Sequence, residues 1–277
     1  MRKESLGDRM KQLEEDGSTC SRFIPLLPVI GRIDGRAFHS FTKDLKRPYD
    51  EALSNLMIEM TKFIVGETGA LVGYTQSDEA SFLWYSEDYK SQIFFNGRAQ
   101  KMNSNVASLA TGFFNENLGK YLPKKKEVSS LTGKFPIFDC RVYNLPVAFE
   151  VTNYFLWRER DATKNSISMA AQSMYSHTQL HKKSGSEKQE MLHEKGVNWN
   201  DYPRHFKRGT YIQRKKEIRG YTAEEMARLS DRHPEKNNPG FTFERSIIKE
   251  LDMPVFEKVT NRIEVIFKGA DPELLES

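Results

Sequence analysis

Apolar residues recur along this chain with two different spacings, and these spacings predict its strands and helices. Runs rich in β-branched and aromatic residues at 29–33, 71–84 and 135–143 are typical of strands, and the middle run is long enough for a hairpin. The stretches that follow Asp50 and that cover 97–118 carry apolar residues at helical spacing. The order strand, helix, hairpin, helix, strand predicts an α+β fold. We expect a ferredoxin-like or polymerase-palm βαββαβ antiparallel sheet with helices on one face.

The rest of the pattern is less regular, and it divides the chain into a palm-like domain over 1–218 and a C-terminal extension over 219–277. Outside the expected sheet we predict a helix over 1–20 with Leu6, Met10 and Leu13 on one side, a polar loop around 123–130, helices over 147–160 and 161–176, a loop-rich segment over 179–200, a linker or lid over 221–240, and a terminal strand over 262–267.

Composition narrows the class of protein. With 277 residues, 38% of them hydrophobic and 29% charged, the chain is long enough for a real core. It has no apolar run of membrane-spanning length, and its charged N-terminus has no signal-peptide core. The two cysteines, Cys20 and Cys140, do not have the spacing of a zinc site or a disulfide framework. We therefore expect a cytoplasmic protein, and a net charge of +4 permits a nucleic-acid partner.

Acidic residues stand where two of the predicted strands end. Asp34 closes the first strand and is followed at once by Gly35, while Asp78 and Glu79 occupy the tip of the hairpin. Carboxylates from separate strands are suited to hard cations, and two of them are the minimum for holding two magnesium ions against a nucleoside triphosphate. The alternative is that Asp34 begins a turn and that Asp78 and Glu79 form a solvated hairpin tip.

Basic residues gather in three places. Residues 35–43 mix glycine, hydroxyls and bases at a turn that enters a helix, a setting that favours a phosphate. Arg98 and Lys101 share one face near the start of a predicted helix, either beside a triphosphate or on a solvated face. Residues 202–216 interleave bases with aromatics, which suits either a nucleic-acid backbone or the edge strand of a hairpin.

Six short motifs occur in one order across roughly residues 5–216, and together they resemble the tRNA-His guanylyltransferase family, most closely its bacterial and phage-type "like" members that polymerise in the 3′-to-5′ direction. The motifs are Arg32-Ile33-Asp34-Gly35-Arg36-Ala37-Phe38-His39, Tyr74 to Glu79, Arg98 to Lys101 leading into Val106-Ala107-Ser108, Phe138-Asp139-Cys140-Arg141, Trp157-Arg158 with Asp161 and Asn165, and Arg208-Gly209-Thr210.

The resemblance implies a role for each matched position. It implies two Mg²⁺ ions held by Asp34, the Gly35 carbonyl and Asp78, with Glu79 as a supporting acid. It implies that a nucleoside triphosphate, ATP or GTP, binds Gly35, Arg36, Ala37, Phe38, His39, Lys43 and Ser77. It implies that the triphosphate or the activated 5′ end of tRNA binds Arg32, Arg98, Lys101, Arg141 and Asn165. The expected tRNA contacts are Arg208, Arg214 and Lys215, and the expected assembly is a homo-oligomer, either dimer or tetramer.

One departure from the family pattern bears on the substrate. Eukaryotic members carry His-Ile-Asn-Asn-Leu-Tyr-Asn where this chain reads Thr163-Lys164-Asn165-Ser166-Ile167-Ser168-Met169. The difference favours template-dependent repair of tRNA 5′ ends over a dedicated addition of G to tRNA-His. A nucleotide cyclase-like palm enzyme and a non-catalytic RNA-binding protein are the alternative functions.

Overall fold

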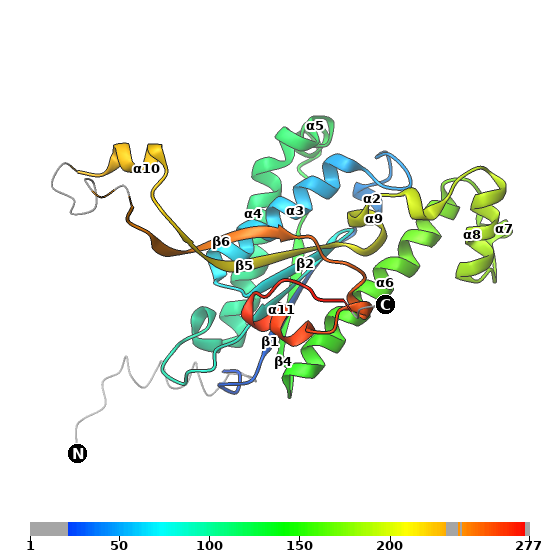
Figure 1. Cartoon of the computed structure of the whole chain (residues 1–277). Helices are drawn as coiled ribbons and strands as arrows, with labels where there is room; N and C mark the ends of the chain where they lie inside the picture. The colour runs from blue at the N-terminus through cyan, green and yellow to red at the C-terminus, as the bar shows by residue number, and fades with distance from the viewer. Residues whose placement is uncertain (1–21, 231–237, 239, 275–277) are drawn as a thin grey trace, which may run out of the picture.

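A six-stranded antiparallel sheet forms the centre of the molecule (Figure 1). The structure is a computed structural model, and it describes residues 22–230, 238 and 240–274. The strands lie in the order β4-β1-β3-β2-β5-β6. Their bounds are β1 Val29–Gly35, β2 Val72–Gln76, β3 Glu79–Trp84, β4 Phe138–Asn144, β5 Thr210–Arg219 and β6 Phe243–Leu251. The expected α+β class with an antiparallel sheet is confirmed, while the helix predicted over 1–20 falls outside the described residues.

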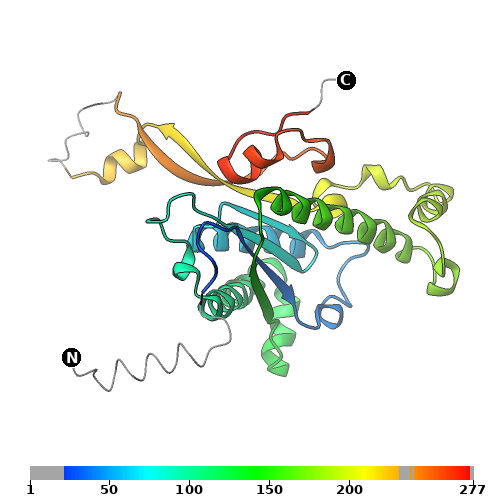
Figure 2. The same cartoon turned by 90° about the horizontal axis from the view of Figure 1, so that it is seen from below.

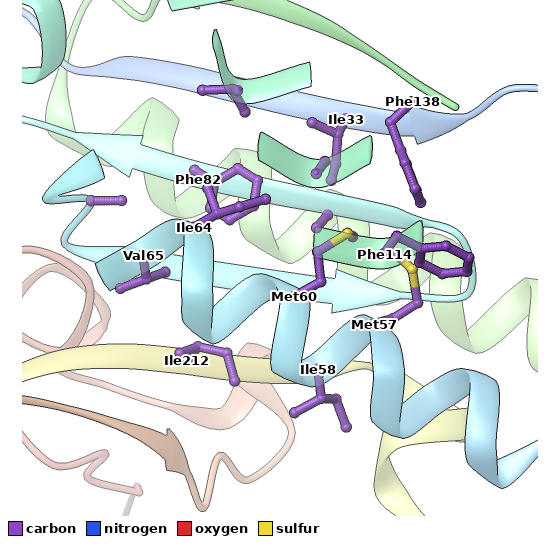
Figure 3. Packing of buried hydrophobic residues seen from close by; sticks show 14 of the residues in the cluster. Ile33, Met57, Ile58, Met60, Ile64, Val65, Phe82, Phe114, Phe138 and Ile212 are labelled. Atoms are coloured by element: carbon purple, nitrogen blue, oxygen red, sulfur yellow. The ribbon is translucent and has the colours of Figure 1, made fainter. Parts of the chain in front are cut away.

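Two long helices, α3 (Glu51–Thr68) and α4 (Ala99–Tyr121), cover one face of the sheet. The Asp50 carboxylate caps α3 by accepting a hydrogen bond from the Leu53 N–H at 3.1 Å. Figure 3 shows the apolar side chains of both helices packed against residues of β1, β3 and β5. This core was predictable because its residues recur at helical spacing on the helices and at every second position on the strands.

The opposite face of the sheet is also covered, by α6 (Ala148–Gln172) and α11 (Arg262–Lys268) (Figure 2). The expectation of helices on one face was therefore incomplete. Apolar residues of the strands point to both faces of the sheet. On β1, Ile33 packs toward α3 and α4, whereas Ile30 packs toward α6. Strands that are apolar on both sides need a cover on both faces.

Several connecting segments form helices that the sequence analysis assigned otherwise. The expected loop at 123–130 is α5 (Pro123–Thr132), with proline in its first turn. Residues 177–201 form α7 (His177–Leu180), α8 (Gly185–Glu194) and a 3₁₀ turn η2 (Trp199–Asp201). Both α7 and α8 begin with capping boxes, led by Ser176 and Ser184, a signal the sequence analysis overlooked. The expected terminal strand is α11, whose adjacent Val265 and Ile266 are both buried.

The predicted break at residues 160–161 does not occur, because α6 is one continuous helix of 25 residues. Arg158 and Glu159, which interrupt its apolar pattern, are nevertheless buried. Their side chains have hydrogen-bond partners inside the protein, so they continue the buried face of α6.

The chain beyond residue 218 extends the same sheet. β5 and β6 pair from Tyr211↔Leu251 to Arg219↔Phe243, and the outer part of this hairpin projects from the body and carries α10 (Ala223–Arg228) (Figure 1). The hairpin returns through the 3₁₀ turn η4 (Phe256–Lys258) to α11. Within the described residues, no helix is both long and apolar enough to cross a membrane.

Candidate active site

Three strands bring acidic residues together where β1 ends. In the register of the sheet, Asp34 on β1 lies directly opposite Glu79 on β3 and Asp139 on β4. Paired residues of neighbouring strands point to the same face of a sheet. Because Ile33 points toward α3 and α4, the side chain of Asp34 points toward the α6 face.

Asp78 joins this group from the β2–β3 turn. Ser77 adopts a left-handed backbone with φ of 55°, and the Gly35 N–H donates a hydrogen bond of 3.1 Å to the Asp78 carbonyl. Burial raises the pKa of the Asp78 carboxyl, the Ser77 hydroxyl that donates to it lowers the pKa, and the negative charge of Asp34 raises it further. The two aspartates thus interact electrostatically although 44 residues separate them in sequence.

Arg158 of α6 anchors the third acid of this group. Its guanidinium donates to Glu79 at 2.8 Å and to Asp161 at 2.9 Å, and Arg158 is only 4% exposed. Burial raises the pKa of the Glu79 carboxyl, whereas Arg158 and Arg32 lower it and Asp34 and Asp78 raise it. The sequence analysis placed Arg158 in a family motif without giving it a role, and the structure makes it the link between α6 and the acids.

Two arginines lie side by side next to the acids. Arg32 and Arg141 are direct cross-strand partners on the face that carries Asp34. Like charges directly opposite each other destabilise a sheet unless an anion lies between them, so this pair is suited to a phosphate. Asn165 lies one turn of α6 beyond Asp161 and donates to its carboxylate at 3.4 Å.

The other two predicted triphosphate ligands lie elsewhere. Arg98 and Lys101 are at the start of α4, and Phe114, thirteen residues further along α4, contacts Phe138 beside the end of β1. Thirteen helical residues span about 20 Å. The structure therefore does not bring Arg98 and Lys101 to Asp34 within one chain, because they lie toward the opposite end of α4.

The segment predicted to hold a nucleotide turns directly after β1. Phe38 in the short helix α2 (Phe38–Phe41) is buried between Phe41, Phe114 and Phe138, so its ring anchors the loop and is not free to stack on a base. Arg36, Ala37 and His39 are exposed, as is Lys43 just beyond the helix. No described residue accepts a hydrogen bond from the backbone N–H of Ala37, Phe38 or His39. Unpaired amides at such a turn are suited to phosphate oxygens.

A cavity opens beside Ser77 that the sequence analysis did not foresee. Its walls come from the segment before α3, the β2–β3 turn, α6 and α9 (Arg204–Arg208). Tyr49 in this wall stacks on Phe206, with ring centroids 4.8 Å apart. The lining residues missed by sequence reasoning include Thr42, Lys46, Tyr49, Asp50, Met169 and His205. Their only sequence signal was the helix cap at Asp50.

Two of the three predicted tRNA contacts have side-chain partners within the protein. Arg214 donates to the carbonyls of Val65 and Gly66 at the end of α3, and Lys215 forms an ion pair with Asp271. Both cations therefore already have partners within the chain, and their assignment as tRNA contacts stays a prediction. Arg208 lies near the buried carboxylate of Glu159, and its carbonyl accepts a hydrogen bond from Tyr74 at 2.8 Å.

The donors around Asp34 fit a hard cation. Asp34 and Asp78 supply carboxylate oxygens and Gly35 supplies a carbonyl, whereas no three His, Cys, Asp or Glu side chains among the described residues are arranged to hold a metal ion on their own. Magnesium is usually held by one or two carboxylates together with substrate phosphates, and this donor set matches that pattern.

Comparison with known proteins identifies the family. The family model described as tRNAHis guanylyltransferase matches residues 7–146, which is half of the chain. The chain belongs to this family. The resemblance predicted from the motifs, and with it the class of nucleotidyltransferase, is confirmed.

Individual relatives agree with this assignment. The tRNA(His) guanylyltransferase of Schizosaccharomyces pombe is 32% identical over 203 residues, which cover 68% of this chain and 74% of the relative. Among solved structures, a bacterial tRNA(His) guanylyltransferase-like protein in complex with ATP has a TM-score of 0.67 and 40% identity, covering 76% of this chain and 87% of that one. The tRNA(His) guanylyltransferase of Saccharomyces cerevisiae has a TM-score of 0.63 and 26% identity, covering 73% and 91%.

Proposed function

We propose that this protein is a magnesium-dependent nucleotidyltransferase that adds nucleotides to the 5′ end of tRNA in the 3′-to-5′ direction. The observation that supports this most strongly is the meeting of Asp34, Asp78 and Glu79 from separate strands, next to the arginine pair of β1 and β4, in a chain of this family. Acids for cations beside bases for phosphates are the parts that phosphoryl transfer needs.

The proposed reaction has two stages. ATP or GTP activates the 5′ phosphate of the RNA by forming a bond from its α-phosphorus to that phosphate, with release of pyrophosphate. The 3′-hydroxyl of the incoming nucleotide then attacks the activated phosphate, and AMP or GMP leaves. A 5′-triphosphate end makes the first stage unnecessary, because pyrophosphate is then the leaving group.

Different residues bind the cations, bind the phosphates and position the supporting acid. Asp34, Asp78 and the Gly35 carbonyl hold Mg²⁺, which when bound neutralises charge on the attacking and leaving oxygens. Arg32 and Arg141 bind the phosphates of the 5′ end, and Asn165 stands at the rim of the same face. Arg158 holds Glu79 in place beside the cations through the hydrogen bond of 2.8 Å that it donates.

The nucleoside triphosphate occupies the turn from Gly35 to His39, with its phosphates on the free amides of that turn. Ser77 borders both this turn and the cavity lined by Tyr49 and Asp50, so the cavity is the natural place for the nucleotide's base. Bacterial tRNA(His) guanylyltransferase-like proteins that are 40% and 36% identical to this chain have been solved in complex with ATP and with GTP.

The substrate is a tRNA, and we infer template-dependent 5′-end repair over a dedicated addition of G to tRNA-His. The departure at residues 163–169, where Asn165 alone keeps the family residue, supports this choice. We further expect a cytoplasmic dimer or tetramer.

The test is a magnesium-dependent assay with labelled nucleoside triphosphates on tRNAs that lack one 5′ nucleotide. Truncated tRNA-His and other truncated tRNAs are compared with full-length tRNA-His. We expect addition to every truncated tRNA according to the opposing base. Addition to full-length tRNA-His alone would contradict repair, and a cyclic product from GTP without RNA would contradict RNA-directed transfer altogether.

A further inference from the structure

One large aromatic side chain near the acids is exposed. Trp157 is 51% exposed, whereas Trp84, in the core, is 1% exposed. Two neighbours contact the indole of Trp157: the Arg158 guanidinium lies 4.4 Å from its ring centroid, and the Tyr154 ring packs edge-on at 5.8 Å. About half of the surface of the residue nevertheless remains open to solvent.

The position of Trp157 on α6 shows which way this open surface faces. Successive helical residues are rotated by about 100°, so Trp157 and Glu159 flank Arg158 on opposite sides of the helix. Glu159 faces the C-terminal segment, because its carboxylate accepts a hydrogen bond from the Phe256 N–H at 2.8 Å. Trp157 therefore lies on the flank turned to β1 and β4, where Tyr143 packs against Tyr154 with ring centroids 6.4 Å apart.

The same flank carries the arginine pair. Arg32 and Arg141 are opposite each other on β1 and β4, and both lower the pKa of Tyr143, whose pKa burial raises. An exposed indole beside two adjacent guanidiniums complements a nucleotide, because the phosphates meet the arginines and the base meets the ring.

We propose that Trp157 is the stacking platform for the 5′-terminal base of the RNA substrate, and this rests on the proposed function. The base lies on the open face of the indole, while Arg158 supports the opposite side and ties the platform to Glu79 at 2.8 Å. Stacking tolerates any base, as a repair enzyme that acts on different tRNAs requires. Trp157 is thus a positioning residue that places the 5′ phosphate next to Asp34 and Asp78.

The test uses an RNA hairpin with a 5′-triphosphate and 2-aminopurine as its 5′-terminal base, because the fluorescence of this base falls when it stacks. We expect quenching on binding by the wild-type protein and by Trp157→Phe, which keeps an aromatic face. Trp157→Leu should lose the quenching and raise KM for the RNA about tenfold or more, with kcat changed less than about threefold.

Phe149→Leu is the matched control. Phe149 is 54% exposed on the same helix, but two turns, about 12 Å, from Trp157. This variant should quench and bind as the wild type does. Retained quenching in Trp157→Leu would overturn the proposal, and so would an equal loss in Phe149→Leu. A change of oligomeric state in Trp157→Leu, measured by light scattering, would assign the ring to a subunit contact and likewise overturn it.

Failure of the proposed function gives a different result. If the wild type quenches the 5′-terminal 2-aminopurine but adds no nucleotide to it in the presence of Mg²⁺, stacking on Trp157 is supported and the proposed nucleotide transfer is contradicted. If it adds nucleotides without quenching, nucleotide transfer is supported and stacking on Trp157 is contradicted.

Discussion

The surroundings of Glu159 set the ionisation of its carboxyl. It is 4% exposed, and burial raises the pKa of its carboxyl from 4.5 to about 7, although the Phe256 N–H, Arg208 and the Tyr211 hydroxyl favour the charged form. The folded protein therefore keeps a proton on Glu159 that the unfolded chain loses. Stability is unaffected by Glu159 below pH 4.5, falls between pH 4.5 and about 7, and is constant above.

Glu159→Gln should remove this pH dependence. The amide still accepts the hydrogen bond from Phe256 and carries no charge. We expect the free energy of unfolding of the variant to equal that of the wild type near pH 5 and to exceed it by about 1–3 kcal/mol near pH 8. Urea unfolding at the two pH values measures this. A variant that is less stable than the wild type at pH 8 would show that the charged form is favoured in the fold.

Removal of Arg158 should lower the stability of the protein, in contrast to Glu159→Gln. Arg158→Met leaves Glu79 and Asp161 without their cation, and loss of one partner of a buried pair costs about 3–5 kcal/mol. We expect a lower free energy of unfolding together with a fall in kcat for nucleotide addition of at least about tenfold. Arg160→Met removes an exposed arginine paired with Glu257 and is the control. Equal effects of the two variants on stability and kcat would show that Arg158 has no particular role in the site.

At the scale of elements, the parts that the sequence predicted best are those with a clear local signal. The helix after Asp50 has a cap and apolar residues at helical spacing, and the hairpin with Glu79 at its tip has two β-prone runs joined by a polar turn. Both are present with bounds close to those expected. The loop predicted at 123–130 and the break predicted inside α6 were wrong for different reasons. The charged residues at 123–130 are exposed or half-buried, yet the segment forms a helix that begins at Pro123. The charged residues at the predicted break, Arg158 and Glu159, are buried among partners in a distant part of the chain.

In the candidate site, too, some residues could be placed from the sequence and others could not. Asp34, Asp78 and Glu79 could be placed because they end strands that pair with each other. Arg214 could not be placed, because its assignment as a tRNA contact depended on composition, and the end of α3 that it contacts is about 150 residues earlier in the chain.

Arg214 should contribute to the fold and not to RNA affinity. Its guanidinium donates hydrogen bonds to the carbonyls of Val65 and Gly66, and alanine removes this donor. Arg214→Ala should therefore lower the free energy of unfolding by about 1–3 kcal/mol. Filter binding should give an unchanged slope of log affinity for tRNA against log salt concentration. Lys216→Ala, two residues along the same strand and exposed, is the control for stability. A shallower slope of log affinity against log salt concentration in Arg214→Ala would show that Arg214 contacts tRNA.

At the scale of the whole molecule, the sheet joins the family-matched part of the chain to its C-terminal part. β6 pairs with β5 from Tyr211 to Arg219, and Phe256 and Val265 belong to the same apolar cluster as Ile30 and Phe155. We expect a chain truncated after residue 218 to lose this cluster and the Glu159 anchor, and to fail to fold. Circular dichroism and a thermal scan of the purified fragment measure this. A fragment with native helix content and a cooperative transition would make residues 219–277 a separate unit.

The central claim is that Asp34 and Asp78 act together on the cations that nucleotide addition needs. The most direct measurement is single-turnover 5′-end addition by Asp34→Ala and by Asp78→Ala, with thermal unfolding recorded on the same preparations. Removing either carboxylate relieves the repulsion between them, so each variant should unfold at the wild-type temperature or above. Addition should fall by about a thousandfold or more in both. Substantial turnover by either folded variant would contradict the account.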